Sequence, residues 1–245
     1  MTLRAIMTRV SRAVDPRAFR ARYAAFVGGI AAISAFILWS PASALAGTTR
    51  DQKIADEIVQ MLAIKPGATV AEIGAGNGAM AVQIAKRIGP RGRVLATELD
   101  AGLVEKINER ARKADVDNVV AVRATATDSG LAPDCCDAAY MIGVYHHITN
   151  PAETDASIFR ALKPGARLLV NDFPPTLWLA LFKVKGVPAN RGGHGVPDKI
   201  VVNEFTEAGF RELKEVRPWH PGFFIRHNYC LVFSKPDNFA TELHQ

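Results

Sequence analysis

The sequence ATVAEIGAGNGA spans residues 68 to 79 and sets the architecture of the chain. A short run rich in β-branched residues is followed at once by three glycines in five positions, and then by an apolar run to Ile88 with helical spacing. A strand that turns through a glycine loop into a helix is typical of the first unit of an open parallel sheet. Such sheets bind ligands beyond the carboxyl ends of their strands. We therefore predict a ligand site directly after residue 73.

The same alternation of strands and helices continues on both sides of this loop. Helices are predicted at 51–62, 79–88, 101–114, 150–162 and 197–208, and strands at 68–73, 93–97, 119–122, 138–142, 167–171, 211–216 and 228–233. Strands in series with helices require parallel pairing with helices on both faces, whereas the last two strands follow each other without a helix. The predicted fold class is α/β, with a doubly wound, mostly parallel seven-stranded sheet and an antiparallel C-terminal edge hairpin.

Composition excludes several classes of protein. The chain has 245 residues, of which 49% are hydrophobic and 22% charged, which is typical of a globular protein and not of a disordered or coiled-coil one. The formal charge is +6, but residues 1–46 hold six arginines and one acid, and the other 199 residues hold 24 Lys+Arg and 23 Asp+Glu. A nearly neutral body lacks the local positive excess that nucleic acids require, so we predict no nucleic-acid partner.

The N-terminal segment has the order of an export signal. Basic residues precede an uncharged stretch at 24–39, and small residues follow at Ala44 and Ala46. We predict that 1–46 is a signal peptide cleaved after Ala46 or a retained membrane anchor, with an organelle transit peptide as the weaker alternative, and that 47–245 is the functional domain. The expected location is therefore exported, periplasmic or extracellular, or membrane-anchored.

Acidic residues flank the glycine loop. Glu72 precedes it, and a carboxylate there would repel a diphosphate but suit a cationic ligand. Glu98 ends the next strand, 22 residues after Gly76, where a carboxylate can accept hydrogen bonds from ribose hydroxyls. Asp100 is an alternative acceptor, although we expect it to cap the helix that follows.

Taken with Glu98, three stretches of the chain carry a family resemblance. The sequences VAEIGAGNG at 70–78, AYMIGVYHHI at 139–148 and RALKPGARLLVNDF at 160–173 resemble the class I S-adenosylmethionine-dependent methyltransferases over roughly residues 51–235, and in particular the small-molecule branch that includes quinone-biosynthesis enzymes. The resemblance implies an enzyme whose methyl donor, S-adenosyl-L-methionine, is held around the glycine loop. The implied donor-binding residues are Glu72, Gly74, Ala75, Gly76, Asn77, Gly78, Glu98 and Leu99, with Thr127 or Asp128 as the adenine contact.

Methyl transfer from a sulfonium is an in-line displacement, so the protein must align the acceptor and at most remove its proton. The loop after the fourth strand faces this point, which makes Tyr145, His146 and His147 candidate catalytic residues, with His146 preferred as the base. Asp172, at the end of the fifth strand, is a second base candidate. His194 lies in a glycine-rich loop that either folds over the site or has no function there.

No metal is needed for this reaction, and we predict none. Cys135 and Cys136 are adjacent rather than at metal-ligand spacing, and the three cysteines do not make a disulfide framework.

The acceptor is predicted to be a small molecule, apolar or aromatic. Residues 177–185 place apolar side chains at helical spacing, which indicates either a lid over such an acceptor or a patch touching lipid. Membrane contact is thus predicted through 24–39 and 177–185, with an ordinary buried helix as the alternative for 177–185.

Two other functions remain open from the sequence. An NAD(P)-dependent oxidoreductase uses a similar sheet, but its third glycine would stand where Ala79 is. A non-catalytic binding module that keeps the donor pocket is the second alternative, because the methyl donor is made in the cytosol and an exported domain needs a supply of it.

Overall fold

The computed structural model describes residues 49–175, 184–220 and 227–237, all within one compact unit, Leu45–Gln245. The predicted leader at 1–46 and most of the predicted lid at 177–185 lie outside these residues. No helix in the described ranges is both long and apolar enough to cross a membrane.

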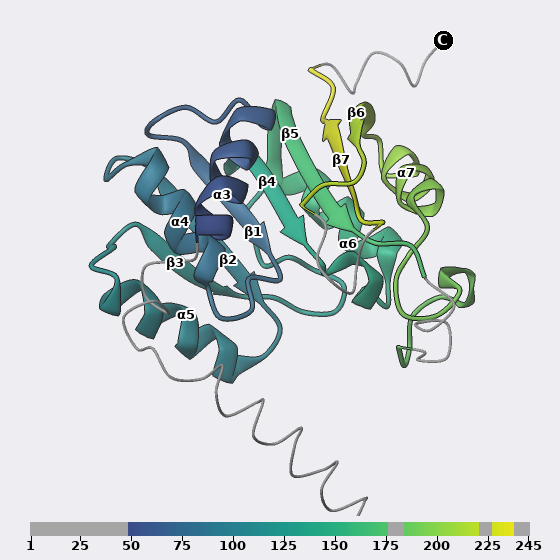
Figure 1. Cartoon of the computed structure of the whole chain (residues 1–245), viewed down its shortest axis with the longest axis horizontal. Coiled ribbons are helices and arrows are strands. Elements are labelled where there is room, and N and C mark those ends of the chain that lie inside the picture. The colour runs from purple at the N-terminus through teal and green to yellow at the C-terminus, as the bar shows by residue number, and fades with distance from the viewer. Residues whose placement is uncertain (1–48, 176–183, 221–226, 238–245) are drawn as a thin grey trace, which may run out of the picture. The chain divides into compact units, whose positions relative to one another are not determined.

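Seven strands form one sheet in the order β3-β2-β1-β4-β5-β7-β6. The strands are β1 (Thr69–Ile73), β2 (Arg93–Glu98), β3 (Val119–Arg123), β4 (Cys136–Ile142), β5 (Leu162–Asp172), β6 (Arg211–Val216) and β7 (Tyr229–Ser234). The first five pair in parallel, and β7 lies antiparallel between β5 and β6. The carboxyl ends of β1, β2, β4 and β5 consequently meet at one edge of the sheet (Figure 1).

The helices form two layers. They are α3 (Thr49–Met61), α4 (Ala79–Ile88), α5 (Ala101–Lys113), α6 (Pro151–Ala161) and α7 (Asp198–Glu207), with short 3-10 turns η2 (Tyr145–His147) and η4 (Ala189–Arg191). Residues of α3, α4 and α5 pack into one hydrophobic core and residues of α6 and α7 into another. The two cores cover opposite faces of the sheet, as the doubly wound prediction requires.

Alternation along the strands produces these two cores. In β4, Tyr140 belongs to the first core and its neighbour Met141 to the second. In β5, Leu169 faces the first core while Leu168 and Val170 face the second. Successive side chains of a strand point to opposite faces, so a strand buried on both faces reads as a continuous apolar run.

The predicted fold class is confirmed, including the antiparallel edge. The predicted helix 79–88 matches α4, and most other boundaries differ by one or two residues. The largest difference is at β5, which begins at Leu162 instead of residue 167. Leu162 pairs with Cys136 before a register shift, so the LKPG turn belongs to the sheet and not to a loop.

Candidate functional site

The glycine loop between β1 and α4 adopts a conformation that other residues rarely take. Gly74, Gly76 and Gly78 all have positive φ, of 69°, 55° and 74°. A Cβ at Gly74 would lie 2.7 Å from the side chain of Val144, and one at Gly78 would lie 3.2 Å from Ile107. Two of the glycines are therefore required by both φ and close packing, and Gly76 by φ alone, since no atom lies within 4 Å of its added Cβ.

Glu98 joins the end of β2 to the glycine loop. Its Oε2 accepts the Gly76 N–H at 2.9 Å, and its Oε1 accepts the Leu99 N–H at 2.7 Å. The Asp100 N–H makes a third, longer bond to Oε1 at 3.4 Å. A carboxylate has about four acceptor positions, so these bonds still leave room for a ligand hydroxyl. Asp100 instead accepts the Leu103 N–H at 2.9 Å and caps α5, as predicted.

Glu72 lies behind the loop, and its side chain is almost fully buried at 6% exposure. Burial raises the pKa of its carboxyl to about 8, and the neighbouring Glu98 adds to this. The Oε2 atom of Glu72 has no hydrogen-bond partner within the described ranges. A buried acceptor without a partner fits a cationic or N–H-bearing ligand at this edge of the sheet.

A cavity of about 390 Å³ opens beside these residues, at the carboxyl ends of β1 and β2. Gly74, Glu98 and Leu99 line the cavity on the side of the glycine loop, and His147 lines it from η2. Leu99, which is 46% exposed, belongs to this lining. The volume is in the range of small-molecule sites. Larger hollows elsewhere, such as the one around Asn118 at the amino ends of the strands, lie away from both the loop and the histidines.

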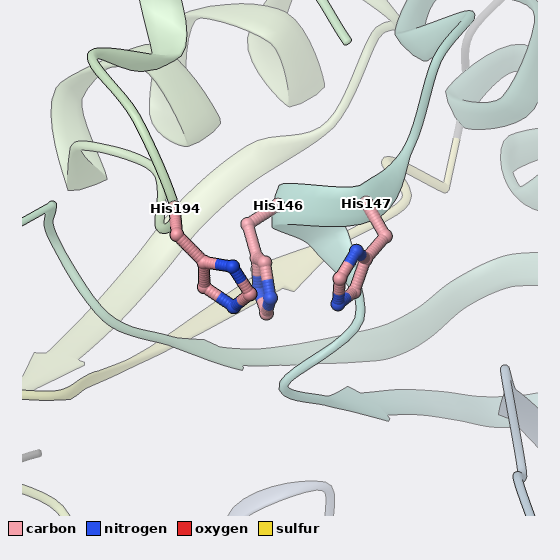
Figure 2. Close-up of side chains that lie close together, drawn as sticks. All are labelled: His146, His147 and His194. Atoms are coloured by element: carbon pink, nitrogen blue, oxygen red, sulfur yellow. The ribbon is translucent and has the colours of Figure 1, made fainter. Parts of the chain in front are cut away.

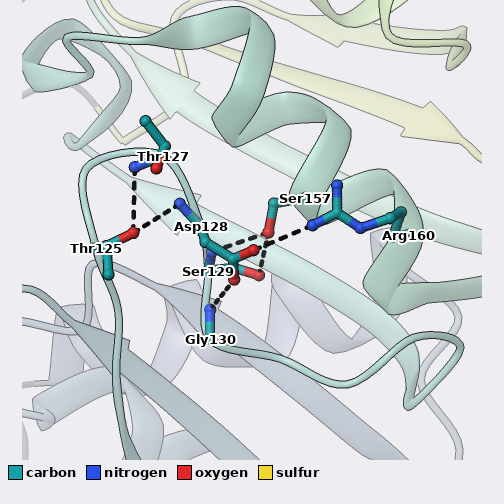
Figure 3. A network of polar contacts seen from close by, with 7 residues as sticks. All are labelled: Thr125, Thr127, Asp128, Ser129, Gly130, Ser157 and Arg160. Atoms are coloured by element: carbon teal, nitrogen blue, oxygen red, sulfur yellow. Dashed lines mark hydrogen bonds and ion pairs between the residues drawn. The ribbon is translucent and has the colours of Figure 1, made fainter.

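The segment after β3 forms another part of the cavity wall. Figure 3 shows the polar contacts within this segment and with α6. The Thr125 hydroxyl accepts the Asp128 N–H at 3.0 Å, and Asp128 in turn accepts the Gly130 N–H at 2.7 Å and pairs with Arg160 at 3.1 Å. Ser129 bonds Ser157 of α6 at 2.8 Å through the two hydroxyls. These contacts hold the segment in place without a helix or strand of its own.

Of the predicted adenine contacts, Asp128 lines the cavity, whereas Thr127 is exposed and is not part of the lining. Sequence reasoning missed further lining residues, namely Ile73, Thr97, Ala124, Thr125, Ala126, Ser129, Val144, Ile148, Thr149 and Thr154. Val144 and Ile148 lie within the quoted stretch AYMIGVYHHI, and Ile73 and Thr97 lie at strand ends. The others belong to no motif, so no sequence signal indicates them beyond their place near the end of a strand or in α6.

Asp172 and His146 form a buried pair at the ends of β5 and β4. His146 Nδ1 lies 2.8 Å from Asp172 Oδ1, and the His146 backbone N–H donates to Oδ2 at 3.0 Å. The Phe173 N–H also donates to Oδ1, at 2.9 Å. Exposures are 2% for His146 and 1% for Asp172. The carboxylate thus fixes the orientation of the imidazole and has little freedom to act on a substrate directly.

The imidazole of His146 lies close to the imidazoles of two other histidines, His147 and His194 (Figure 2). The ring of His146 lies 4.0 Å from that of His147 and 4.8 Å from that of His194, measured between centroids. Burial lowers the pKa values of His147 and His194, and the nearby His146 lowers both further. His194 lies beside His146 and His147 but is not among the residues that line the cavity, so its folding over the site stays a prediction.

Tyr145 is placed differently from its two neighbours. It is fully buried, and its hydroxyl oxygen lies 2.6 Å from Asp155 Oδ2 and 2.8 Å from Glu204 Oε2, within hydrogen-bond distance of both carboxyl groups. Arg191 pairs with Glu204 at 2.8 Å and lies over the Tyr145 ring. Burial raises the pKa of Tyr145 far above its usual value and that of Asp155 to about 8. These contacts favour a structural role for Tyr145, and its catalytic role stays a prediction.

Comparison with known proteins shows which class of domain the chain resembles. The family model described as "Methyltransferase domain" matches residues 71–170, which include the glycine loop, Glu98 and the histidine pair. A solved structure of a SAM-dependent methyltransferase from Aquifex aeolicus superposes with a TM-score of 0.61, at 20% identity, over 74% of this chain and 89% of that one, and so shares the fold. Residues 71–170 therefore match a methyltransferase domain, and the predicted resemblance to the class I S-adenosylmethionine-dependent methyltransferases is confirmed.

Within that class, the chain is similar to small-molecule methyltransferases. The ubiquinone/menaquinone biosynthesis C-methyltransferase UbiE of Vibrio vulnificus (strain YJ016) is 28% identical over 121 residues, 49% of this chain and 46% of UbiE. The 27-O-demethylrifamycin SV methyltransferase of Amycolatopsis mediterranei (strain S699) is 31% identical over 161 residues, 65% and 58% of the two chains. The match spans about half the length of these curated relatives. The oxidoreductase alternative is not favoured by any of these similarities.

Proposed function

We propose that this protein binds S-adenosyl-L-methionine at the carboxyl ends of β1 and β2 and transfers its methyl group to a small-molecule acceptor. The single observation that carries the proposal is the bond from the Gly76 N–H to Glu98, which joins the glycine loop and the strand-end acid at the rim of the 390 Å³ cavity. Glu98 has acceptor positions for the ribose hydroxyls. The unpartnered Glu72 Oε2 fits the cationic amino acid part of the donor.

S-adenosyl-L-methionine, once bound, supplies an activated methyl group on a positively charged sulfur. The residues of this chain then have to orient the two reactants and exclude water. The loop glycines allow the ligand close to the backbone, and Leu99 offers an apolar surface at the cavity wall. His147 lines the same cavity, so we place the acceptor on the histidine side of the donor.

The donor site is tested with a matched pair of glycines. Gly76 and Gly67 both have positive φ, of 55° and 86°, and neither has an atom closer than 4.0 Å to an added Cβ. Gly67 lies at the other end of β1, before the strand begins. Gly76→Ala and Gly67→Ala should therefore cost similar stability, about 1 kcal/mol each. Only Gly76→Ala should weaken donor binding, by at least tenfold in calorimetry.

Wild-type protein that binds a nicotinamide dinucleotide but not S-adenosyl-L-methionine would overturn the proposal. Equal donor affinity in Gly76→Ala and the wild type would show that the donor does not bind at the glycine loop.

For the acceptor, we propose an apolar or aromatic small molecule with an ionisable or activated position. Several of the lining residues are aliphatic, and similar proteins include a ubiquinone/menaquinone biosynthesis C-methyltransferase and a demethylrifamycin methyltransferase. The test incubates the protein and donor with a panel of quinols, phenols and aliphatic alcohols and measures S-adenosylhomocysteine. Tight donor binding with no product from any acceptor would favour the non-catalytic binding module instead.

For location, we propose that 1–46 directs export or anchors the domain. The arginine-rich flank and the uncharged stretch at 24–39 support this proposal. Sequencing the N-terminus of the mature protein is the test. A mature chain that begins at Gly47 indicates a cleaved signal, and an intact N-terminus in a membrane fraction indicates an anchor. An intact N-terminus in the soluble cytosolic fraction would overturn both.

A further inference from the structure

Three histidines from two distant segments bring their rings together at the acceptor side of the cavity. His146 and His147 come from η2 after β4, and His194 comes from the glycine-rich loop after η4. One nitrogen from each ring lies within 4.8 Å of the others (Figure 2). Methyl transfer to a small molecule needs at most one base, so the proposed function does not require three imidazoles in contact.

The position of His146 is fixed by a carboxylate. Its Nδ1 is 2.8 Å from Asp172 Oδ1, and that oxygen already accepts the Phe173 N–H. Because carboxylate oxygens accept hydrogen bonds, this contact favours the tautomer with the proton on Nδ1, which leaves Nε2 available to a metal ion. A histidine held in this way by a carboxylate is the usual arrangement of a metal-ligating histidine.

The loop that carries His194 is packed so that its ring must lie near the other two. Gly195 has a φ of +119°, and a Cβ there would lie 2.8 Å from the Phe173 carbonyl oxygen. The Val196 N–H donates to the same carbonyl at 2.9 Å, and the His194 ring stacks on that of Phe173. A residue with a side chain at position 195 would push the loop away from β5, so the glycine places His194 beside His146.

We propose that His146, His147 and His194 form a site for a divalent transition metal ion of the Zn²⁺ type. Three imidazole nitrogens with one open position are the ligand set of catalytic zinc sites, and imidazole also suits Co²⁺ and Ni²⁺. Nitrogens around tetrahedral Zn²⁺ are about 3.4 Å apart, so the rings need to turn until the ligating nitrogens are closer by up to about 1.4 Å. His147 is exposed and His194 is half-buried, which leaves both side chains room to move.

The open position has a function if the proposed methyl transfer is correct, and this part rests on that proposal. His147 also lines the donor cavity, so a metal it holds lies next to the acceptor. A hydroxyl oxygen of the acceptor bound to the metal loses its proton to water more readily than the free hydroxyl does. The acceptors favoured by such a site are therefore hydroxyl compounds such as phenols and quinols.

The test measures metal binding by the full-length, untagged protein after treatment with a chelator. Zn²⁺ is titrated by calorimetry, and Co²⁺ is followed by its visible absorption. We expect one Zn²⁺ per chain and a Co²⁺ spectrum typical of a four-coordinate site with three nitrogen ligands and one water. Substoichiometric or absent binding would overturn the proposal and leave the histidines as candidate bases.

Variants locate the site. His194→Ala and His147→Ala should each weaken Zn²⁺ binding at least tenfold, and His147→Ala, at an exposed residue, serves if His194→Ala does not fold. The matched control is His220→Ala, because His220 contacts Glu57 and lies outside the cluster. Equal weakening in the control, or none in either cluster variant, would place the metal elsewhere.

Donor binding separates this inference from the proposed function. Titration with S-adenosylhomocysteine should give the same affinity in His194→Ala and in the wild type. Metal loss with donor binding intact supports the site, while absent donor binding in the wild type counts against the methyltransferase proposal alone.

Discussion

The glycine loop and the histidine cluster lie at the same edge of the sheet but are built in opposite ways. The loop consists of consecutive residues, and its shape follows from glycines with positive φ. The cluster joins η2 to a loop some 48 positions later, through contacts with Asp172 and Phe173. A local motif carries its geometry in the sequence, whereas the cluster exists only after β4 and β5 have paired. Donor binding should therefore depend on the loop and catalysis on the cluster.

The largest expected effect is at the loop. Glu98→Ala removes the acceptor for the Gly76 and Leu99 N–H groups and for the proposed ribose hydroxyls. Hydrogen bonds to a charged group contribute about 1.5–3 kcal/mol each, so losing two to the donor weakens its binding about 10³-fold. Calorimetry with S-adenosylhomocysteine measures this. The control is Glu105→Ala, at an exposed residue of α5. A tenfold effect or less would show that Glu98 only shapes the loop.

The second-largest effect is expected from His146→Ala, and it should appear in the rate of methyl transfer and not in donor binding. His146→Ala removes the imidazole that Asp172 orients and leaves that buried carboxylate with one partner fewer. Product formation should fall about 10²-fold at saturating donor, as is usual when an acid-base or metal-ligating group is lost. The donor dissociation constant should stay within twofold. If the variant folds, as judged by its melting temperature, and yet loses donor binding, then donor binding depends on the histidine cluster as well as on the glycine loop.

Much of the fold was predictable because its elements are set locally. The helix 79–88 begins after a glycine and ends at Gly89, and the apolar run at 168–170 within the predicted strand lies in the buried part of β5. The two-residue periodicity that separates the two cores is also visible in β4. The start of β5 was not predicted. Its first pairing, between Leu162 and Cys136, depends on a register shift that no local sequence pattern indicates.

The site was predictable where one motif supplies it. Glu98 and the loop lie together as expected, and Asp100 caps α5. The contribution of Thr125 and Ser129 to the cavity wall was missed, because their placement depends on hydrogen bonds with Asp128 and Ser157. The meeting of three histidines was missed for the same reason, namely that it requires long-range packing.

A smaller effect on stability and on donor affinity is expected from a change of pH. Burial raises the pKa of Glu72 to about 8, from an ordinary value of 4.5. Between these values the folded protein holds a proton that the unfolded chain has lost, so the free energy of unfolding should fall as pH rises from 5 to 8. A cationic donor favours the ionised carboxylate, and donor affinity should therefore rise, by up to tens of fold, from pH 6 to 8.

Glu72→Gln isolates this effect, because it keeps the shape of the side chain and cannot ionise. Other groups face Glu72, namely Tyr140 from β4 and Glu98 from β2, and both remain in the variant. Calorimetry at a series of pH values should give weaker binding with a flatter profile. An unchanged slope in Glu72→Gln would assign the pH dependence to another group.

The smallest effect on activity is expected at Tyr145, which adjoins the histidines in sequence but points into the helical layer of α6 and α7. Tyr145→Phe removes hydrogen bonds to Asp155 and Glu204 and should cost about 1–3 kcal/mol of unfolding free energy in denaturant titration. Product formation per folded molecule should stay within twofold, because the hydroxyl does not line the cavity. A folded variant with no activity would instead place Tyr145 in the reaction. It would also mean that the chemistry extends beyond the face of η2 that carries His147.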